Sequence, residues 1–211
     1  MIRKTRLRDA IRRFRLWADE RFPQARHGEW ETEYEHWDDL YNAVTGVLET
    51  SETAWDEETK ELLIYAVARD NEVGLLAERL TASQLSTLAA ASIESNESDA
   101  KWQFADKLSK SSPTEERESL LLSFGNDANE YVRRRSFMAL ADCGSRHAER
   151  LALAAWDSGD EYQRMACLHA LSRLSSPALP NYLKLAEEDG RQHLRGIAEQ
   201  IKNGTGEYAG R

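Results

Sequence analysis

Cysteine and proline are scarce in this chain of 211 residues, and both scarcities narrow the possible folds. The two cysteines, Cys143 and Cys167, form no metal-binding or redox motif, so we expect Cys167 to be a reduced core thiol rather than a metal ligand or half of a disulfide. The four prolines lie at or between predicted helix ends, and no long Gly/Ser-rich linker divides the chain. We therefore expect a single domain over residues 1–202, followed by a flexible tail over residues 203–211.

Long hydrophobic runs are also missing. No segment approaches the roughly 18 consecutive apolar residues that a membrane-spanning helix needs. The basic residues at the N-terminus are not followed by the uninterrupted apolar core of a signal peptide. These features predict a protein that does not interact with membranes and that lies in the cytoplasm.

The familiar catalytic motifs are absent as well. The chain has no Gly-rich phosphate loop, no His-Glu-x-x-His, no cysteine pair at ligand spacing and no Gly-x-Ser-x-Gly. Its five histidines lie apart in the sequence. We therefore expect no catalytic residues, no cofactor and no metal, and a chain that is not an enzyme.

What the chain does contain is a pattern that returns every 31 residues in its C-terminal half. Val132-Arg133-x-x-Ser136-x-x-Ala139-Leu140 recurs as Gln163-Arg164-x-x-Cys167-x-x-Ala170-Leu171 and then as Leu194-Arg195-x-x-Ala198-x-x-Ile201. A small residue followed by apolar residues three and four positions later gives a narrow helical face that another helix can approach closely. Each period is long enough for two helices, so it predicts a helical hairpin, and three in succession predict a stacked array.

The segment Asp127-x-x-x-x-Val132-Arg133-Arg134-x-Ser136-x-x-Ala139-Leu140 resembles the second-helix signature of HEAT-type repeats, most clearly over residues 113–202. This resemblance implies an all-α protein, a right-handed α-solenoid of HEAT-like helical hairpins with about 11–12 helices. It also implies that the repeated arginines, Arg133, Arg164 and Arg195, bond acidic residues of adjacent units.

Charge is distributed unevenly. Residues 1–26 hold nine Lys or Arg against three acids, whereas the whole chain has a net charge of −9. Leu7, Ile11, Phe14 and Trp17 advance by helical steps in this basic segment. We expect residues 1–26 to form a basic amphipathic helix that caps the array and pairs with the next helix.

The next segment combines aromatic and acidic residues. The aromatic and apolar positions from Trp30 to Leu48 advance by three or four, which predicts one helix with a packing stripe. The acids would project from its other sides as a partner-binding surface made of Glu29, Glu31, Glu33, Glu35, Asp38 and Asp39. Such an acidic surface favours a basic protein partner and disfavours nucleic acid, whose affinity comes from phosphate neutralisation.

A second candidate surface is the concave face that the resemblance implies, with Arg134, Arg135 and Trp156 as its candidate residues. Arg133 would be structural, while Arg134 and Arg135 would point elsewhere and be available for an acidic ligand.

The preferred hypothesis is a non-enzymatic protein-binding module, and an inhibitor or immunity protein that neutralises a basic partner such as a toxin is the concrete class that it suggests. One alternative is a HEAT-like DNA glycosylase of the alkylpurine type, since Trp37-Asp38, Trp55-Asp56 and Trp156-Asp157 are superficially similar to its site residues. The other alternative is a structural scaffold subunit of a larger assembly.

Overall fold

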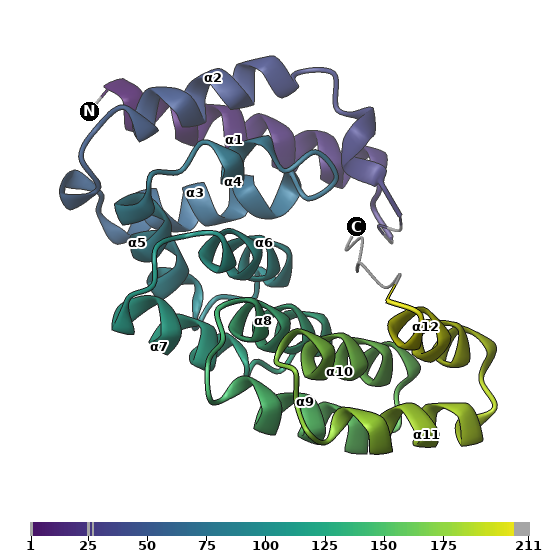
Figure 1. Ribbon diagram of the computed structural model, residues 1–211. Helices are drawn as coiled ribbons and strands as arrows, with labels where there is room; N and C mark the ends of the chain where they lie inside the picture. The colour runs from purple at the N-terminus through teal and green to yellow at the C-terminus, as the bar shows by residue number, and fades with distance from the viewer. Residues whose placement is uncertain (1, 25, 27, 205–211) are drawn as a thin grey trace. The chain divides into compact units, whose positions relative to one another are not determined.

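The computed structural model describes residues 2–24, 26 and 28–204, and every regular element in that part of the chain is helical (Figure 1). The all-α prediction is confirmed, and twelve α-helices and two short 3₁₀ helices occur among the described residues. The chain divides into two compact units, residues 1–107 and 108–211. The single-domain interpretation of residues 1–202 stays a prediction.

The first unit contains two 3₁₀ helices, η1 and η2, between longer helices. Its elements are α1 (Ile2–Arg21), η1 (Trp30–Glu33), α2 (Trp37–Leu48), η2 (Glu52–Ala54), α3 (Glu57–Arg69), α4 (Leu75–Glu78), α5 (Ala82–Ser92) and α6 (Ser98–Ser109), the last of which ends just inside the second unit. Helix α1 packs against α2 and α3, so the predicted pairing with the next helix is confirmed, whereas its role as a cap of the array stays a prediction. Its buried face is Leu7, Ala10, Ile11, Phe14 and Ala18.

The predicted continuous helix from Trp30 to Leu48 is wrong, because the chain leaves the helical conformation at Tyr34. Tyr34 is extended, with φ −73° and ψ 114°, and the indole N–H of Trp37 donates to the carbonyl of Glu31 at 2.9 Å. The break lets Trp30 and Tyr34 both pack on Phe14, with ring centroids 5.8 and 4.7 Å away. The packing role predicted for the aromatic residues is confirmed, although the element is a 3₁₀ turn followed by a helix.

Local signals account well for α3. The side chain of Asp56 accepts a hydrogen bond from the backbone N–H of Thr59 at 3.0 Å, and Glu57 and Glu58 occupy the first turn, where the helix dipole favours acids. At the other end, the buried carboxylate of Asp70 accepts from the hydroxyl of Tyr41 at 2.5 Å and from the N–H of Leu76 at 2.7 Å. This carboxylate therefore holds the turn between α3 and α4.

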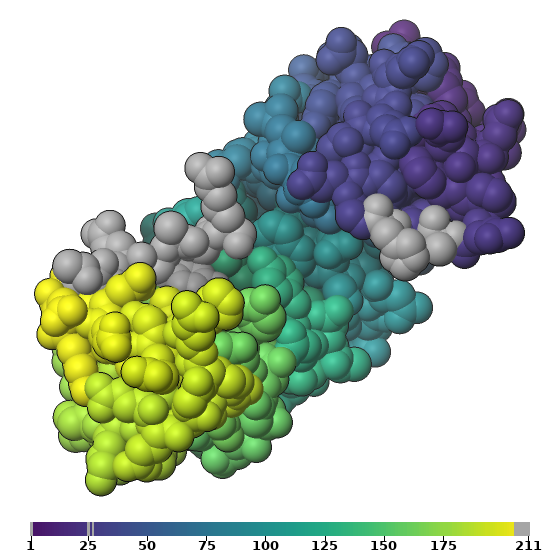
Figure 2. Space-filling view, turned by 90° about the vertical axis from the view of Figure 1, so that its right-hand side faces the viewer, coloured from purple at the N-terminus to yellow at the C-terminus, as the bar shows by residue number. Residues whose placement is uncertain are grey.

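The second unit is a stack of three helical hairpins. Its helices are α7 (Glu115–Phe124), α8 (Glu130–Asp142), α9 (Ala148–Asp157), α10 (Glu161–Arg173), α11 (Leu179–Asp189) and α12 (Gln192–Lys202). Helix α8 packs on α10 and α10 on α12, and these three form the inner layer (Figure 1). Helices α7, α9 and α11 form the outer layer, each packed against inner-layer helices. In the space-filling view, the surfaces of the green and yellow C-terminal helices are continuous (Figure 2).

The small residues of the 31-residue pattern lie where the layers meet. Ser136, Cys167 and Ala198 are all fully buried. The hydroxyl of Ser136 donates to the carbonyl of Leu121 in α7, which shows that this side of α8 faces the outer layer. Burial also raises the pKa of Cys167 to about 12, so Cys167 is a protonated core thiol, as predicted.

Candidate functional site

The acidic segment differs from the predicted surface at Glu31, whose side chain was expected to project into solvent. Glu31 is only 4% exposed, because the turn of η1 directs it inward while its neighbour Trp30 packs on Phe14. Burial raises the pKa of the Glu31 carboxyl, and its Oε2 atom makes no hydrogen bond. Glu31 is therefore an interior residue and cannot contact a partner at the surface.

Two more acids of this segment are already paired within the first unit. Arg21 of α1 donates to Glu33 at 3.3 Å, and Arg13 of α1 donates to Asp39 at 2.6 Å. The remaining three, Glu29, Glu35 and Asp38, are exposed and take part in no ion pair within the described part of the chain. We call these three the acidic patch, and their role in binding stays a prediction.

The basic helix α1 uses much of its charge on its own unit. Arg3 pairs with Glu49 at 3.0 Å, Lys4 with Glu58 at 2.7 Å and with Asp56, and Arg8 with Glu58 at 2.7 Å. The hydrogen bonds from Arg8 and Lys4 lower the pKa of Glu58 to about 2. These cations of α1 therefore offset acids of residues 33–58, whereas Arg6 and Arg12 are exposed and take part in no ion pair within the described residues.

The tryptophans of the three Trp-Asp pairs are buried or packed against another ring. Trp55 is 6% exposed, and Asp56 caps α3 and pairs with Lys4. Trp156 is 6% exposed and packs edge-on against Tyr182, with ring centroids 5.0 Å apart. Trp37 stacks on Tyr41 at 5.4 Å. Each tryptophan is thus engaged in packing within its own unit.

Trp156 was also predicted to line the inner face, and this placement is wrong. It lies in the outer-layer helix α9, where its ring contacts Tyr182 of α11 and the guanidinium of Arg164 at 5.0 Å. The repeat signature identifies the second helix of each hairpin, and Trp156 falls in a first helix.

The predicted arginine ladder is confirmed at one position. Arg164 pairs with Asp189 in the following hairpin, and its Nε donates to the carbonyl of Trp156 at 3.1 Å. Arg133 instead donates to the carbonyls of Asp127 and Ala128, both at 2.7 Å, and so fastens the loop before its own helix. Arg195 is exposed. Arg133 is structural as expected, but through carbonyl groups and not through an acid.

Arg134 is not the exposed residue that the sequence predicted. It is 9% exposed, and its guanidinium lies over the rings of Tyr131 and Tyr162, 4.7 and 5.3 Å from their centroids. Arg135 is half-buried and already interacts with another group of the chain. The guanidinium of Arg134 therefore lies between a ring of α8 and a ring of α10, and its availability for an acidic ligand stays a prediction.

A second ladder joins the outer layer to the loops, and the sequence analysis missed it. Ser145 donates to Glu118 at 2.5 Å, and Ser176, 31 residues later, donates to Glu149 at 2.7 Å. Both serines are at least nine-tenths buried. The repeat period was the signal that could have found these pairs, because the glutamates are also 31 residues apart.

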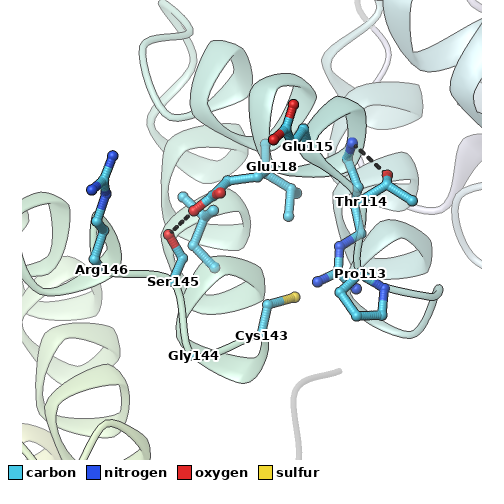
Figure 3. Close-up of a pocket in the computed structure, with 11 residues that line it drawn as sticks. Pro113, Thr114, Glu115, Glu118, Cys143, Gly144, Ser145 and Arg146 are labelled. Atoms are coloured by element: carbon cyan, nitrogen blue, oxygen red, sulfur yellow. Dashed lines mark hydrogen bonds between the residues drawn. The ribbon is translucent and has the colours of Figure 1, made fainter.

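A surface pocket of about 500 Å³ adjoins the first Ser–Glu pair, at the start of α7 and the loop after α8 (Figure 3). The side chain of Thr114 caps α7 by accepting from the N–H of Arg117, and Cys143 points into the pocket. Burial raises the pKa of the Cys143 thiol, so it is protonated at neutral pH and a weak nucleophile. The polar groups of this pocket hold the repeat together, and its thiol is not activated for covalent chemistry.

Neither a metal-binding cluster nor a membrane-spanning helix occurs among the residues that the structure describes. Across residues 2–24, 26 and 28–204, no group of three or more His, Cys, Asp or Glu is placed to hold a metal ion. Within the same residues, no helix combines the length and the apolar character needed to cross a membrane.

Comparison with known proteins agrees with the arrangement of the second unit. A family model of HEAT repeats matches residues 117–201, which run from α7 to α12. No curated protein and no solved structure gave a significant match to the chain. HEAT repeats are helical modules that serve protein interaction and scaffolding. The geometry and the match together show that residues 117–201 belong to the HEAT-like helical repeat family.

Proposed function

We propose that the protein is a non-enzymatic protein-binding module whose acidic first unit recognises a basic protein partner, in the manner of an inhibitor or immunity protein. The HEAT repeats support the binding role, since stacked hairpins present extended surfaces to other proteins. The proposal includes no cofactor, metal or membrane, and it locates the protein in the cytoplasm.

The proposal of a basic partner rests on the net negative charge of the first unit. Residues 1–107 contain 14 Lys and Arg against 22 Asp and Glu, whereas residues 108–211 contain 14 against 15. Four arginines of α1, Arg3, Arg8, Arg13 and Arg21, are paired with acids of the same unit, which leaves other acids of the unit for a partner. Glu29, Glu35 and Asp38 are part of that excess and are exposed within ten residues of sequence.

This charge would act mainly on the rate of encounter. Complementary charge steers two proteins together and raises the association rate, and added salt screens the effect over about 10 Å at 0.1 M. A basic toxin would then be captured quickly, which is what neutralisation requires. DNA would be repelled, because its binding depends on neutralising phosphates.

The test begins with capture of partners from the native host on the immobilised full chain, at low and at moderate salt, followed by mass spectrometry. The association rate of the recovered partner is then measured by stopped-flow fluorescence. Reversing the acidic patch with Glu29→Lys, Glu35→Lys and Asp38→Lys should slow association about tenfold or more at low salt and much less at high salt.

The matched control reverses three other exposed acids, Glu94, Asp157 and Glu199, and therefore changes the net charge equally. An equal loss of rate in this control would show that only total charge matters. An unchanged rate in the patch variant would remove the patch from the interface. A partner that binds stoichiometrically and independently of salt would replace inhibition with a scaffold role, and salt-sensitive DNA binding without any protein partner would refute the proposal.

A further inference from the structure

Arg134 in α8 is a buried cation for which the described part of the chain supplies no acidic partner. It is 9% exposed, and its Nε is enclosed and makes no hydrogen bond. Within the described residues its interactions are those with the rings of Tyr131 and Tyr162. Unlike Nε, the two terminal nitrogens of the guanidinium are not fully enclosed. They can therefore receive a ligand from the surface.

Other arginines of the inner layer are satisfied by polar groups. Arg164 pairs with Asp189, Arg173 pairs with Asp142, and Arg133 donates to two carbonyls. Removing a charge from water is costly unless hydrogen bonds and a counter-charge compensate for it. Aromatic faces attract a guanidinium, but they do not accept its in-plane N–H groups. Arg134 is therefore held in position with its capacity for hydrogen bonding largely unused.

The 31-residue register relates the two rings that contact this group. Tyr131 and Tyr162 occupy equivalent positions on α8 and α10, and so do Met138 and His169. Met138 and His169 are buried, and burial lowers the pKa of His169 to about 4, so its imidazole is neutral at pH 7. Tyr162 is 64% exposed, so its ring is open to solvent. The guanidinium thus lies between the half-buried ring of Tyr131 and the exposed ring of Tyr162.

The charge of the two layers is opposite in sign. The inner helices α8, α10 and α12 contain seven Lys or Arg and four acids, whereas the outer helices α7, α9 and α11 contain three Lys or Arg and eight acids. An acidic ligand would therefore be attracted to the inner layer although the whole chain has a net charge of −9.

We propose that Tyr131, Arg134 and Tyr162 form a receptor for an Asp or Glu side chain within an acidic segment of a partner protein. The carboxylate would accept two hydrogen bonds from the guanidinium, whose planar fork suits that geometry. The apolar part of the same segment would pack on the exposed ring of Tyr162. This inference rests on the proposed function only in that the ligand is a protein. It lies in the second unit, and its charge is opposite to that of the acidic patch in the first unit.

The first measurement uses the Nε–H resonance of Arg134 in the ¹⁵N-labelled full chain, assigned by its loss in Arg134→Lys. The probe is a short, terminally blocked peptide in which Glu alternates with Leu, and the matched peptide has Gln in place of Glu. We expect the Glu peptide to shift the Arg134 resonance in a saturable manner and the Gln peptide to leave it in place. Because the signal is read in the unmodified protein, the result does not depend on the folding of a variant.

The second measurement compares affinities for the labelled Glu peptide by fluorescence anisotropy. Arg134→Gln should weaken binding about tenfold or more, and Arg134→Lys should recover only part of the loss because an ammonium group lacks the bidentate geometry. Arg150→Gln removes the same charge from an exposed position in outer-layer helix α9 and should leave the affinity unchanged. Circular dichroism confirms that each variant is folded.

Several outcomes would overturn the inference. Equal binding of the Glu and Gln peptides, or equal loss of affinity in Arg134→Gln and Arg150→Gln, would show that no specific carboxylate site exists. Binding of a phosphoserine peptide or of DNA in preference to the Glu peptide would assign the site to phosphate. If none of the probes moves the Arg134 resonance while a basic partner still binds through the acidic patch, this inference fails and the proposed function stands. If the Glu peptide binds but the chain captures no basic protein, the proposed function fails and the receptor stands.

Discussion

Phe14 is the residue on which the packing of the first unit can be tested most sharply. It is fully buried in α1, and its ring centroid lies within 6.2 Å of the rings of Trp17, Trp30, Tyr34, Trp37 and Tyr65. Phe14→Ala removes all of these contacts at once. If the aromatic residues are core and not a docking surface, this change should be among the most destabilising in the unit.

The magnitude follows from the burial and the geometry. Truncating a fully buried Phe to Ala costs about 3–5 kcal/mol, which already includes the cavity left behind. The edge-on pair with Tyr34, at 4.7 Å, is one of the arrangements that stabilise aromatic pairs by about 0.5–1.5 kcal/mol beyond area burial. We therefore expect a loss in the upper part of the range, about 4–5 kcal/mol in the free energy of unfolding.

The assay is urea denaturation followed by tryptophan fluorescence, since five of the six tryptophans lie in residues 1–107 and report mainly on the first unit. The control is Leu16→Ala in the same helix, because Leu16 is 60% exposed. It should change the free energy of unfolding by no more than about 0.5 kcal/mol. A loss below about 1 kcal/mol for Phe14→Ala would refute the reasoning, because the rings would then not be closed around Phe14.

Three further predictions concern single polar groups. Burial raises the pKa of Glu31, so its ionisation lowers the stability of the fold as the pH rises through that pKa. Glu31→Gln should therefore raise the midpoint of thermal unfolding at pH 7, and the gain should shrink towards pH 4. The guanidiniums of Arg191 and Arg164 hold the pKa of Asp189 well below its usual range, so the stabilisation is complete above about pH 4 and declines as the pH falls towards the lowered pKa. Asp189→Asn should lower the midpoint of thermal unfolding at pH 7 and lower it less at pH 2, and an equal effect at both pH values would contradict the ion pairs. Ser176→Ala leaves the carboxylate of Glu149 without its donor and should cost about 1–3 kcal/mol in urea denaturation followed by circular dichroism, against little change for the exposed control Ser119→Ala.

The sequence determined the repeat architecture with little help from tertiary structure. The pattern beginning at Val132, Gln163 and Leu194 located α8, α10 and α12, because each hairpin of such an array packs mainly on its neighbours and repeats the same local spacing. The cap at Asp56 was equally local, since its carboxylate bonds an N–H only three residues away. The sequence also contains the signal that places Trp156 in the outer layer, because Trp156 lies before the repeated pattern, in the first helix of its hairpin.

Only the tertiary structure decided which charges are free. Glu31 and Arg134 looked like surface residues because charged side chains are seldom buried, and nothing in their immediate sequence marks the packing that encloses them. Glu33 and Asp39 are paired with arginines of α1 that lie 12 and 26 residues earlier in the chain, so they are not available to a partner. A helical period specifies the face on which a side chain lies, and burial depends on which other element covers that face. The sequence by itself therefore determined the helices and their repeat, whereas the folded units determined which acids and arginines remain for a partner.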